Sequence, residues 1–375
     1  MNESTKQTIL RARQTLHGLA ELAGEERKTQ AYIKEFLAAH TTLRVVDRGG
    51  WLYAVHDEGA ARTVIVRADH DAVPTSCGAR HLCGHDGHTA ALLGLGLLLE
   101  GQRLGKNLIL LFQPAEETGA GAAQCCALLA ELGSARPPEP AAPIVPRLCV
   151  IGCHNIPGEP LGTALFRRGT FACASCGAEI SLTGRPTHAA YPENGLNPAG
   201  AAARLTLGLP AIARALAAEY GCMVLATVVG LRVGERAFGM AASEGKLWVT
   251  LRAEKSAAFE ALNARVDRAV RAAAEAEGLG CSIERLDVFP ATENHAALQD
   301  ALEAACRRAG RPYKYLDRPF RWSEDFGWYG QYAPACFFGV GAGEESPPLH
   351  TEAYEYPDAL APKTAELFFS LAQAL

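Results

Sequence analysis

The chain has 375 residues, of which 49% are hydrophobic and 21% charged, and its formal net charge is −5. This length exceeds what one small hydrophobic core serves, and the composition is ordinary for a globular protein, so two domains are expected. The negative charge excludes a basic surface for nucleic acid or an anionic membrane, and we expect neither as a partner. The polar N-terminus, residues 1–7, lacks the apolar core of a signal peptide, which favours a cytoplasmic location.

The first half of the chain alternates short apolar runs with helical patterns. Strands are expected at 62–68, 107–112 and 148–153, and helices at 87–100 and 119–132. Strands that alternate with helices predict a mostly parallel sheet covered by helices on both faces, an α/β fold. Ligands of such sheets bind beyond the carboxyl ends of the strands. Residues 134–143 are rich in proline and are expected to form a surface connection.

The pattern changes near residue 173. Strands are expected at 177–183, 222–232, 246–252 and 281–289, with helices at 198–220 and 256–277. This β-α-β-β-α-β order is typical of an α+β ferredoxin-like unit. We therefore expect residues 172–289 to form a domain inserted into a larger domain made of residues 1–171 and 290–375.

The richest group of metal-binding residue types is the segment His81-Leu-Cys-Gly-His-Asp-Gly-His88. Imidazole and thiolate are the side chains that bind borderline-soft divalent metals best, and zinc is the commonest of these metals. Cys83 and His85 are two residues apart, so both can face one ion from a looping backbone. The alternative, a polar loop in which histidines cluster by chance, gives no reason for the thiol. The segment predicts a metal-binding loop that opens a core helix.

Carboxylates follow the expected strands. Glu116 and Glu117 come after the second strand, where one could bind a metal and the other could hold a water molecule as a general base. Adjacent acids can also simply begin a helix. Asp71 follows the first strand and could orient a metal-binding imidazole, although a turn-forming aspartate before Pro74 is the other interpretation.

Three further histidines stand alone in the sequence. His154 and His350 become candidate metal ligands because a pair of metal ions needs about five donors, and Cys83, His85 and Glu117 supply only three. His188, in a loop after an expected strand of the inserted domain, is weak evidence by itself.

In chain order, several motifs resemble those of the peptidase family M20 amidohydrolases, in the branch of the aminoacylases, hippurate hydrolases and plant auxin-conjugate hydrolases. The resemblance extends over nearly the whole chain, and its most specific part is Cys83-Gly-His-Asp-Gly-His88 with Pro114-Ala-Glu-Glu117 downstream. The other motifs are Arg67-Ala-Asp-His-Asp-Ala-Val-Pro74, Gly152-Cys-His-Asn155, Thr187-His-Ala-Ala-Tyr-Pro192, Ser323-Glu-Asp-Phe326 and Leu349-His350.

This resemblance implies a catalytic domain with two divalent metal ions, zinc or manganese with cobalt or nickel also possible, and an inserted lid through which homodimers form. The metal ligands it implies are Cys83, His85, Glu117, His154 and His350. Cys83 would bridge the two ions. Glu116 would be the general base, Asp71 the residue behind the metal site, and His188 a lid histidine that reaches the partner's active site and steadies the oxyanion.

The expected function is therefore hydrolysis of the amide bond of small N-acyl amino acids, by attack of a metal-bound water with Glu116 as general base. The first alternative is a dipeptidase or exopeptidase that uses the same dinuclear site on a dipeptide-like substrate. The non-enzymatic alternatives are a metal-binding or cysteine-rich redox protein and a catalytically inactive binding module. The lid departs from the family pattern at residues 237–241, where an asparagine usually reads the substrate carboxylate.

Overall fold

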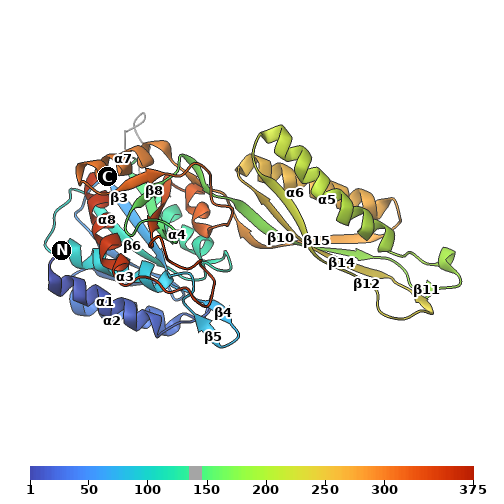
Figure 1. The fold of residues 1–375 in the computed structure, drawn as a ribbon, viewed down its shortest axis with the longest axis horizontal. Helices are drawn as coiled ribbons and strands as arrows, with labels where there is room; N and C mark the ends of the chain where they lie inside the picture. The colour runs from blue at the N-terminus through green and yellow to red at the C-terminus, as the bar shows by residue number, and fades with distance from the viewer. Residues whose placement is uncertain (135–145) are drawn as a thin grey trace. The chain divides into compact units, whose positions relative to one another are not determined.

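The structure, a computed structural model, describes residues 1–134 and 146–375, so nearly all of the proline-rich stretch at 134–143 lies outside the described residues. The chain divides into two compact units (Figure 1). Unit 1 contains residues 1–171, 292–319 and 325–375, and unit 2 contains residues 172–291 and 320–324. Unit 2 thus holds the range 172–289, in which the sequence predicts an insertion, together with residues 290–291 and 320–324.

Unit 1 is built of strands and helices that alternate along most of its length. Its elements are α1 (Glu3–His17), α2 (Arg27–His40), β1 (Arg44–Asp47), β2 (Leu52–His56), β3 (Thr63–Asp69), β4 (Val73–Thr75), β5 (Gly78–Arg80), α3 (His85–Leu99), β6 (Asn107–Gln113), α4 (Gly121–Ser134), β7 (Leu148–Ile156), β8 (Ala164–Phe166), β9 (Gly169–Ala172), β16 (Thr292–Asn294), α7 (Ala296–Arg308), β17 (Tyr313–Tyr315), the 3₁₀ helix η2 (Asp325–Gln331), β18 (Ala335–Gly341) and α8 (Leu360–Ala374).

The central sheet of unit 1 has the strand order β1-β2-β6-β3-β7-β18-β8-β17. Its middle strands β6, β3, β7 and β18 run parallel, whereas β1 and β2 pair antiparallel at one edge. All residues of β3, β7 and β18 are buried, as expected for strands covered on both faces. The carboxyl ends of the four parallel strands therefore meet at one edge of the sheet.

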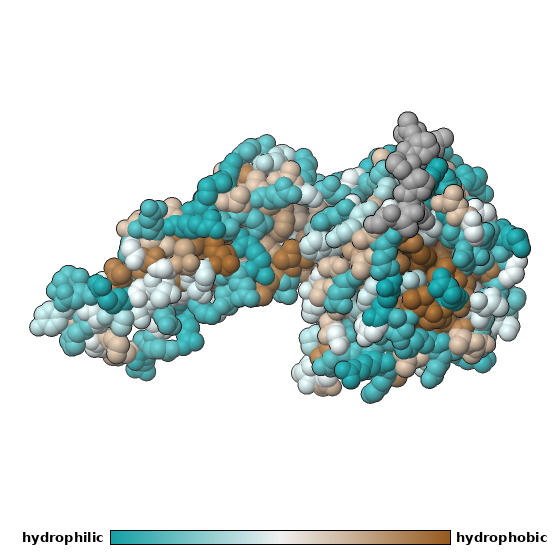
Figure 2. Space-filling model, turned by 180° about the vertical axis from the view of Figure 1, so that it is seen from behind, coloured by the Kyte–Doolittle hydropathy of each residue, from teal (hydrophilic) through white to brown (hydrophobic). Residues whose placement is uncertain are grey.

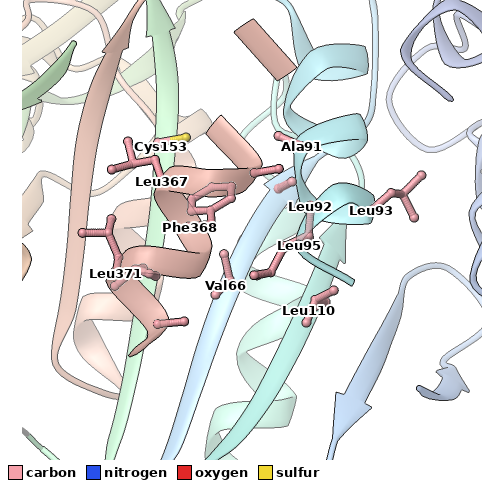
Figure 3. Close-up of a cluster of buried hydrophobic side chains, with 14 of the residues drawn as sticks. Val66, Ala91, Leu92, Leu93, Leu95, Leu110, Cys153, Leu367, Phe368 and Leu371 are labelled. Atoms are coloured by element: carbon pink, nitrogen blue, oxygen red, sulfur yellow. The ribbon is translucent and has the colours of Figure 1, made fainter. Parts of the chain in front are cut away.

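The core of unit 1 lies between the sheet and the helices α3 and α8 (Figure 3). Leu92 and Leu95 of α3 and Phe368 of α8 pack with Val66 and Leu110 from the sheet. Beyond its first turn, helix α3 is apolar on nearly all sides. This suits its position, since α1 and α8 cover the sides that the sheet leaves open. This burial fixes the first turn of α3, which carries His85, against the sheet.

Unit 2 follows the expected β-α-β-β-α-β order. Its elements are β10 (Ala174–Thr183), β11 (Thr187–His188), the 3₁₀ helix η1 (Pro192–Asn194), α5 (Ala199–Tyr220), β12 (Val224–Val233), β13 (Met240–Ala241), β14 (Glu244–Ala253), α6 (Ser256–Glu275) and β15 (Gly280–Phe289). Together with the sheet of unit 1, this order confirms the predicted fold class, an α/β domain with a ferredoxin-like insertion.

The sheet of unit 2 has the order β12-β14-β10-β15 and is antiparallel throughout. Helices α5 and α6 pack on one of its faces over a separate hydrophobic core. Helix α5 is long and apolar enough to cross a membrane by length and composition, but it packs on β12 and α6 as a core helix does.

Apolar residues reach the surface of both units (Figure 2). In unit 2 they include Leu207 of α5 and Val229 of the edge strand β12.

Candidate metal centre

The predicted site residues of unit 1 gather at the carboxyl edge of its parallel strands. Asp71 lies just beyond β3, and Glu116 and Glu117 lie just beyond β6. His154 is inside β7 near its end rather than after it, because β18 continues to pair with β7 as far as Ile156. Cys83 and His85 reach the same edge from the start of α3, and His350 from the loop after β18.

A glycine allows the loop to turn into α3. Gly84 has a φ of 96° and caps the helix that begins at His85. A Cβ atom at this position would lie 2.7 Å from Oδ1 of Asn155. The left-handed backbone and the close approach both require glycine, and the turn brings Cys83 and His85 to the same side.

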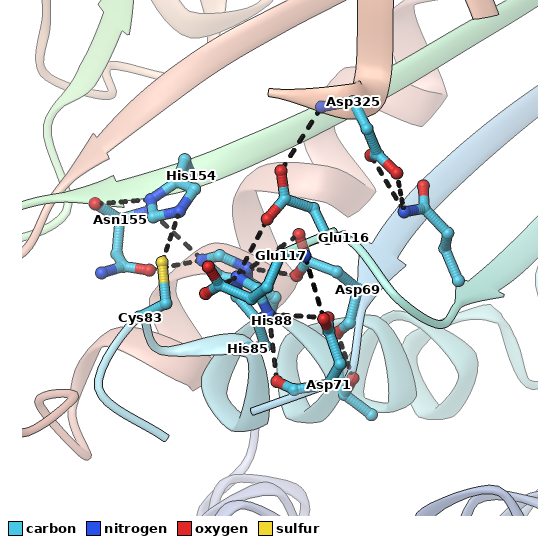
Figure 4. A network of polar contacts seen from close by, with 12 residues as sticks. Asp69, Asp71, Cys83, His85, His88, Glu116, Glu117, His154, Asn155 and Asp325 are labelled. Atoms are coloured by element: carbon cyan, nitrogen blue, oxygen red, sulfur yellow. Dashed lines mark hydrogen bonds and ion pairs between the residues drawn. The ribbon is translucent and has the colours of Figure 1, made fainter. Parts of the chain in front are cut away.

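Two groups of three possible ligands share one thiol. Figure 4 shows four of the five residues, Cys83, His85, Glu117 and His154. The first group is Cys83, His85 and His154, and the second is Cys83, Glu117 and His350. In each group the donor atoms lie within 4.8 Å of one another. The structure thus brings together all five residues that the sequence suggested as metal ligands, and Cys83 belongs to both groups.

Hydrogen bonds set the direction of two imidazoles. His85 Nδ1 lies 3.1 Å from Asp71 Oδ1, and His154 Nδ1 lies 2.8 Å from the backbone oxygen of Asn155. Each Nδ1 can donate its proton to that oxygen, which leaves the Nε2 lone pair of each ring to face another group. Nε2 of His154 lies 3.3 Å from the Cys83 sulfur. Nε2 of His85 is buried and has no hydrogen-bond partner among the described residues. A buried ring nitrogen without a partner, next to a thiol, fits a bound cation.

The carboxylate of Asp71 connects two parts of the site. Its Oδ1 atom accepts from His85, while its Oδ2 atom accepts from the backbone N–H of Glu117 at 3.0 Å. Asp71 therefore holds the loop after β6 against the start of α3. The sequence left open whether Asp71 orients a ligand or forms a turn; the structure places its carboxylate against His85 and the backbone of Glu117.

The charges around the donor atoms favour a cation. Burial by itself lowers the pKa of His85, but Asp69 and Cys83 raise this pKa well above its ordinary value. Hydrogen bonds to Cys83 and Glu117 raise the pKa of His350 to about 10. Burial and then Glu117 raise the pKa of the Cys83 thiol, so its thiolate needs a positive charge nearby. A divalent metal ion supplies this charge without a proton.

Glu116 lies beside these donors. Its Oε2 atom is 4.0 Å from Nε2 of His85, and Oε1 of Glu117 is 3.8 Å from the same nitrogen. Since His85, Glu116 and Glu117 also fall within 4.8 Å of one another, distance alone does not separate a ligand from a base among these acids. Of the two, only Glu117 also groups with Cys83 and His350.

A tight turn places these two acids between β6 and α4. The backbone nitrogens of Ala120 and Gly121 both bond the carbonyl oxygen of Ala115, which itself has a φ of 50°. A Cβ atom on Gly121 would lie 1.6 Å from the carbonyl oxygen of Pro114. The turn therefore closes only with glycine at residue 121.

We expect Gly121→Ala to destabilise the protein by about 2–3 kcal/mol, because backbone atoms must move apart to admit the methyl group. Urea denaturation measures this change. Gly133→Ala, in the same helix, is the matched control, since no atom of the described residues lies within 4 Å of its added Cβ. This control should lose no stability and gain up to about 1 kcal/mol. A Gly121→Ala protein as stable as its parent would contradict the close approach.

His188 lies apart from this group, in unit 2. It is exposed on the short strand β11, which pairs with β13, and its Nδ1 atom accepts from the backbone N–H of Ala190 at 3.1 Å. A cavity of about 420 Å³ adjoins it and is lined mainly by apolar groups, among them Met240. Phe238 in the neighbouring loop is 89% exposed.

Several buried residues beneath the site are not among those predicted from the sequence to be functional. His88 is held from both sides: its Nδ1 atom lies 2.6 Å from Oδ1 of Asp69, and its Nε2 atom contacts Oδ1 of Asn155. The side chains of Arg67 and Asp325 form a buried ion pair, with 2.7 Å between Nη2 and Oδ1. Arg67, Asp69, Asn155 and Asp325 all occur in the motifs that carried the family resemblance. Nothing in their spacing, however, indicates that residues 258 positions apart would meet.

The family model of peptidase family M20/M25/M40 matches residues 65–374. The chain belongs to this family. Among its M20 relatives are N-acetyldiaminopimelate deacetylase of Leuconostoc citreum, 27% identical with 94% of this chain and 92% of the relative covered, and an IAA-amino acid hydrolase of Arabidopsis thaliana, 28% identical with 96% and 85% covered. The resemblance inferred from the motifs is confirmed.

Two solved structures, one of them a peptidase of the M20 family, have the same fold. A dinuclear metal-binding peptidase from Bacillus subtilis has a TM-score of 0.80 at 22% identity, with 99% of this chain and 98% of that chain covered. An aminobenzoyl-glutamate utilization protein from Klebsiella pneumoniae has a TM-score of 0.73 at 22% identity, with 99% and 96% covered. These matches extend over both units of the M20 chain described here.

Proposed function

We propose that this M20 hydrolase is a metallo-amidohydrolase that cleaves the amide bond of N-acyl amino acids. The observation that carries the proposal is the pair of donor groups that share Cys83 and lie beside Glu116. The names of curated relatives support the substrate class: N-acetylcysteine deacetylase of Bacillus subtilis, N-acetyldiaminopimelate deacetylase and IAA-amino acid hydrolase. All three names describe hydrolysis of an acyl group from the amine of an amino acid.

We infer that two divalent metal ions bind to the five donors. Cys83, His85 and His154 would hold one ion, and Cys83, Glu117 and His350 would hold the other, so Cys83 would contribute to both sites. Thiolate and imidazole favour zinc by softness, whereas the carboxylate also suits manganese, and cobalt or nickel would fit the same donors. Bound metal would polarise the substrate carbonyl and lower the pKa of a water molecule.

Glu116 carries the proton in the proposed reaction. Its carboxylate takes a proton from the attacking water, whose oxygen forms the new bond to the carbonyl carbon. The C–N bond then breaks, and Glu116 returns the proton to the leaving amine. Asp71 keeps His85 oriented throughout, through the bond from Nδ1 to its carboxylate.

His188 is proposed to stabilise the oxyanion of the tetrahedral intermediate, as the M20 resemblance implies, after reaching an active site from the lid of a partner subunit. We propose that the enzyme is a cytoplasmic homodimer that assembles through unit 2. The exposed side chains of Leu207 and Val229, on α5 and on the edge strand β12, support an interface there.

Hydrolysis of a small substrate panel tests the function. Protein stripped of metal by a chelator is resupplied with zinc, manganese, cobalt or nickel, and each form is given acetyl-, benzoyl- and aminoacyl-amino acids. We expect little activity without metal and a clear preference for acyl over aminoacyl substrates. Faster hydrolysis of the aminoacyl compounds would assign a dipeptidase instead, and no metal-dependent hydrolysis of any compound would overturn the proposal.

A further inference from the structure

A buried ion pair lies directly behind the proposed general base. Arg67, inside β3, is fully buried, and its guanidinium donates from three nitrogens. Nη1 lies 2.6 Å from Asp69, Nη2 lies 2.7 Å from Asp325, and Nε lies 2.7 Å from Oε1 of Gln113. None of these residues belongs to the two donor groups that share Cys83.

Position 325 requires a group that only accepts hydrogen bonds. Three donors converge on the Asp325 carboxylate: Nη2 of Arg67 at 2.7 Å, Nε2 of Gln113 at 2.9 Å from both oxygens, and the backbone N–H of Ala122 at 2.9 Å. The Gln113 amide cannot turn over to present its oxygen instead. That oxygen already accepts from Arg67 and, at 2.9 Å, from the Tyr329 hydroxyl.

The same aspartate reaches Glu116 through its backbone. The N–H of Asp325 points to Oε1 of Glu116 at 3.3 Å, and Figure 4 shows this contact on one side of Glu116 and the donor groups on the other. The other carboxylate oxygen of Glu116, Oε2, faces His85. Anchoring the Asp325 side chain therefore fixes the donor that orients Glu116.

We propose that Asp325 is a positioning residue for Glu116, held in place by Arg67 and Gln113; this inference rests on the proposed function. A buried ion pair by itself is weak evidence for stability, because desolvation of the charges offsets their attraction. The Arg67–Asp325 pair is better explained as a device that keeps Glu116 in position, since a shift of about 1 Å in a reacting group can cost about 100-fold in rate. Through these bonds, Arg67 of β3 and Gln113 of β6 hold Asp325, the first residue of η2, in a fixed position.

Asp325→Asn tests the inference, because it keeps the shape and puts an amide N–H against the converging donors. We expect kcat to fall by about 30- to 100-fold with KM changed by less than about threefold, at unchanged metal content. Gln113→Met removes the amide that donates to Asp325 and also the oxygen that accepts from Arg67 and Tyr329. It leaves the Asp325 carboxylate itself in place and should lower kcat by about tenfold, again with KM unchanged. The double variant Q113E/D325N returns the negative charge and an acceptor to the cluster, and should recover about tenfold of the kcat lost in D325N.

Asn294→Asp is the matched control. The Asn294 amide donates to the backbone oxygens of Arg167 and Phe337 at 2.9 and 2.8 Å, so a carboxylate there creates a comparable buried mismatch elsewhere in unit 1. This control should lower the melting temperature as Asp325→Asn does, yet leave kcat within about twofold. Equal kcat values in the two variants would overturn the inference.

A crystallographic comparison gives a readout independent of turnover. In Asp325→Asn we expect the Glu116 carboxylate to leave its contact with the backbone nitrogen of residue 325, and in Asn294→Asp to keep it. A Glu116 that stays in place in both variants would overturn the positioning role. Parent protein that hydrolyses no compound of the panel would instead count against the proposed function, while the crystal structures would still decide the role of Asp325.

Discussion

Replacing Glu116 by glutamine is expected to lower kcat by about 10³- to 10⁴-fold while the protein keeps its metal. Glutamine has nearly the same shape and can still accept from the backbone N–H of Asp325, which now bonds Oε1 at 3.3 Å. Its amide, however, cannot take a proton from water or return one to the leaving amine. Glu116→Ala should lose as much activity, and it also removes the group that holds the water in place.

Steady-state kinetics on the best acyl substrate and metal analysis of the same samples check this prediction. Glu131→Gln is the control, because Glu131 is an exposed carboxylate that pairs with Arg48 on the surface. It should leave kcat unchanged. Because Glu116 also lies within ligand distance of His85 and Glu117, metal analysis is decisive. Loss of metal in Glu116→Gln would make Glu116 a ligand, and retained turnover would remove it from the chemistry.

Removing the Cys83 thiol is expected to reduce metal binding more than removal of any other single donor. Cys83 is the one residue common to the groups with His154 and with His350, so Cys83→Ala takes a donor from both proposed ions. We expect the metal content to fall from two ions per chain to below one, with loss of nearly all activity. His154→Ala and His350→Ala should each lose mainly one ion.

Metal content after dialysis against a weak chelator and the rise in melting temperature on adding metal both measure this effect. Cys336→Ala is the control, since Cys336 is a fully buried thiol of β18 outside both groups. It should bind the same amount of metal as the parent. Two ions retained by Cys83→Ala would refute a shared thiolate.

The arrangement of the donors could be predicted because it follows from a general property of parallel sheets. Strand patterns at 62–68 and 107–112 predicted where β3 and β6 end, and side chains beyond those ends meet at one edge. The metal-binding loop was recognisable because a thiol between imidazoles has little structural use. In unit 2 the buried alternate positions of β10 and β14 hold apolar residues, so the sequence pattern alone indicates these strands.

What lies behind the donors was not predictable from patterns. Asp325 meets Arg67 because η2 packs beside α4, β16, β7 and β18, and no local periodicity encodes that contact. Asn155 follows His154 in the sequence, and its backbone oxygen holds the His154 imidazole. Its side chain, however, contacts His88, which the sequence does not indicate. Long-range hydrogen bonds of this kind depend on tertiary packing and carry no signal at fixed spacing.

The division of unit 1 along the chain constrains how the protein can fold during synthesis. Strand β7 pairs with β18, yet the whole of unit 2 lies between them in the sequence. At about 5–20 residues per second, a ribosome needs on the order of ten seconds or more to deliver β18 after β7. Until then the edge of β7 is open to other strands. In a nascent chain this edge should therefore stay exposed until β18, residues 335–341, has emerged.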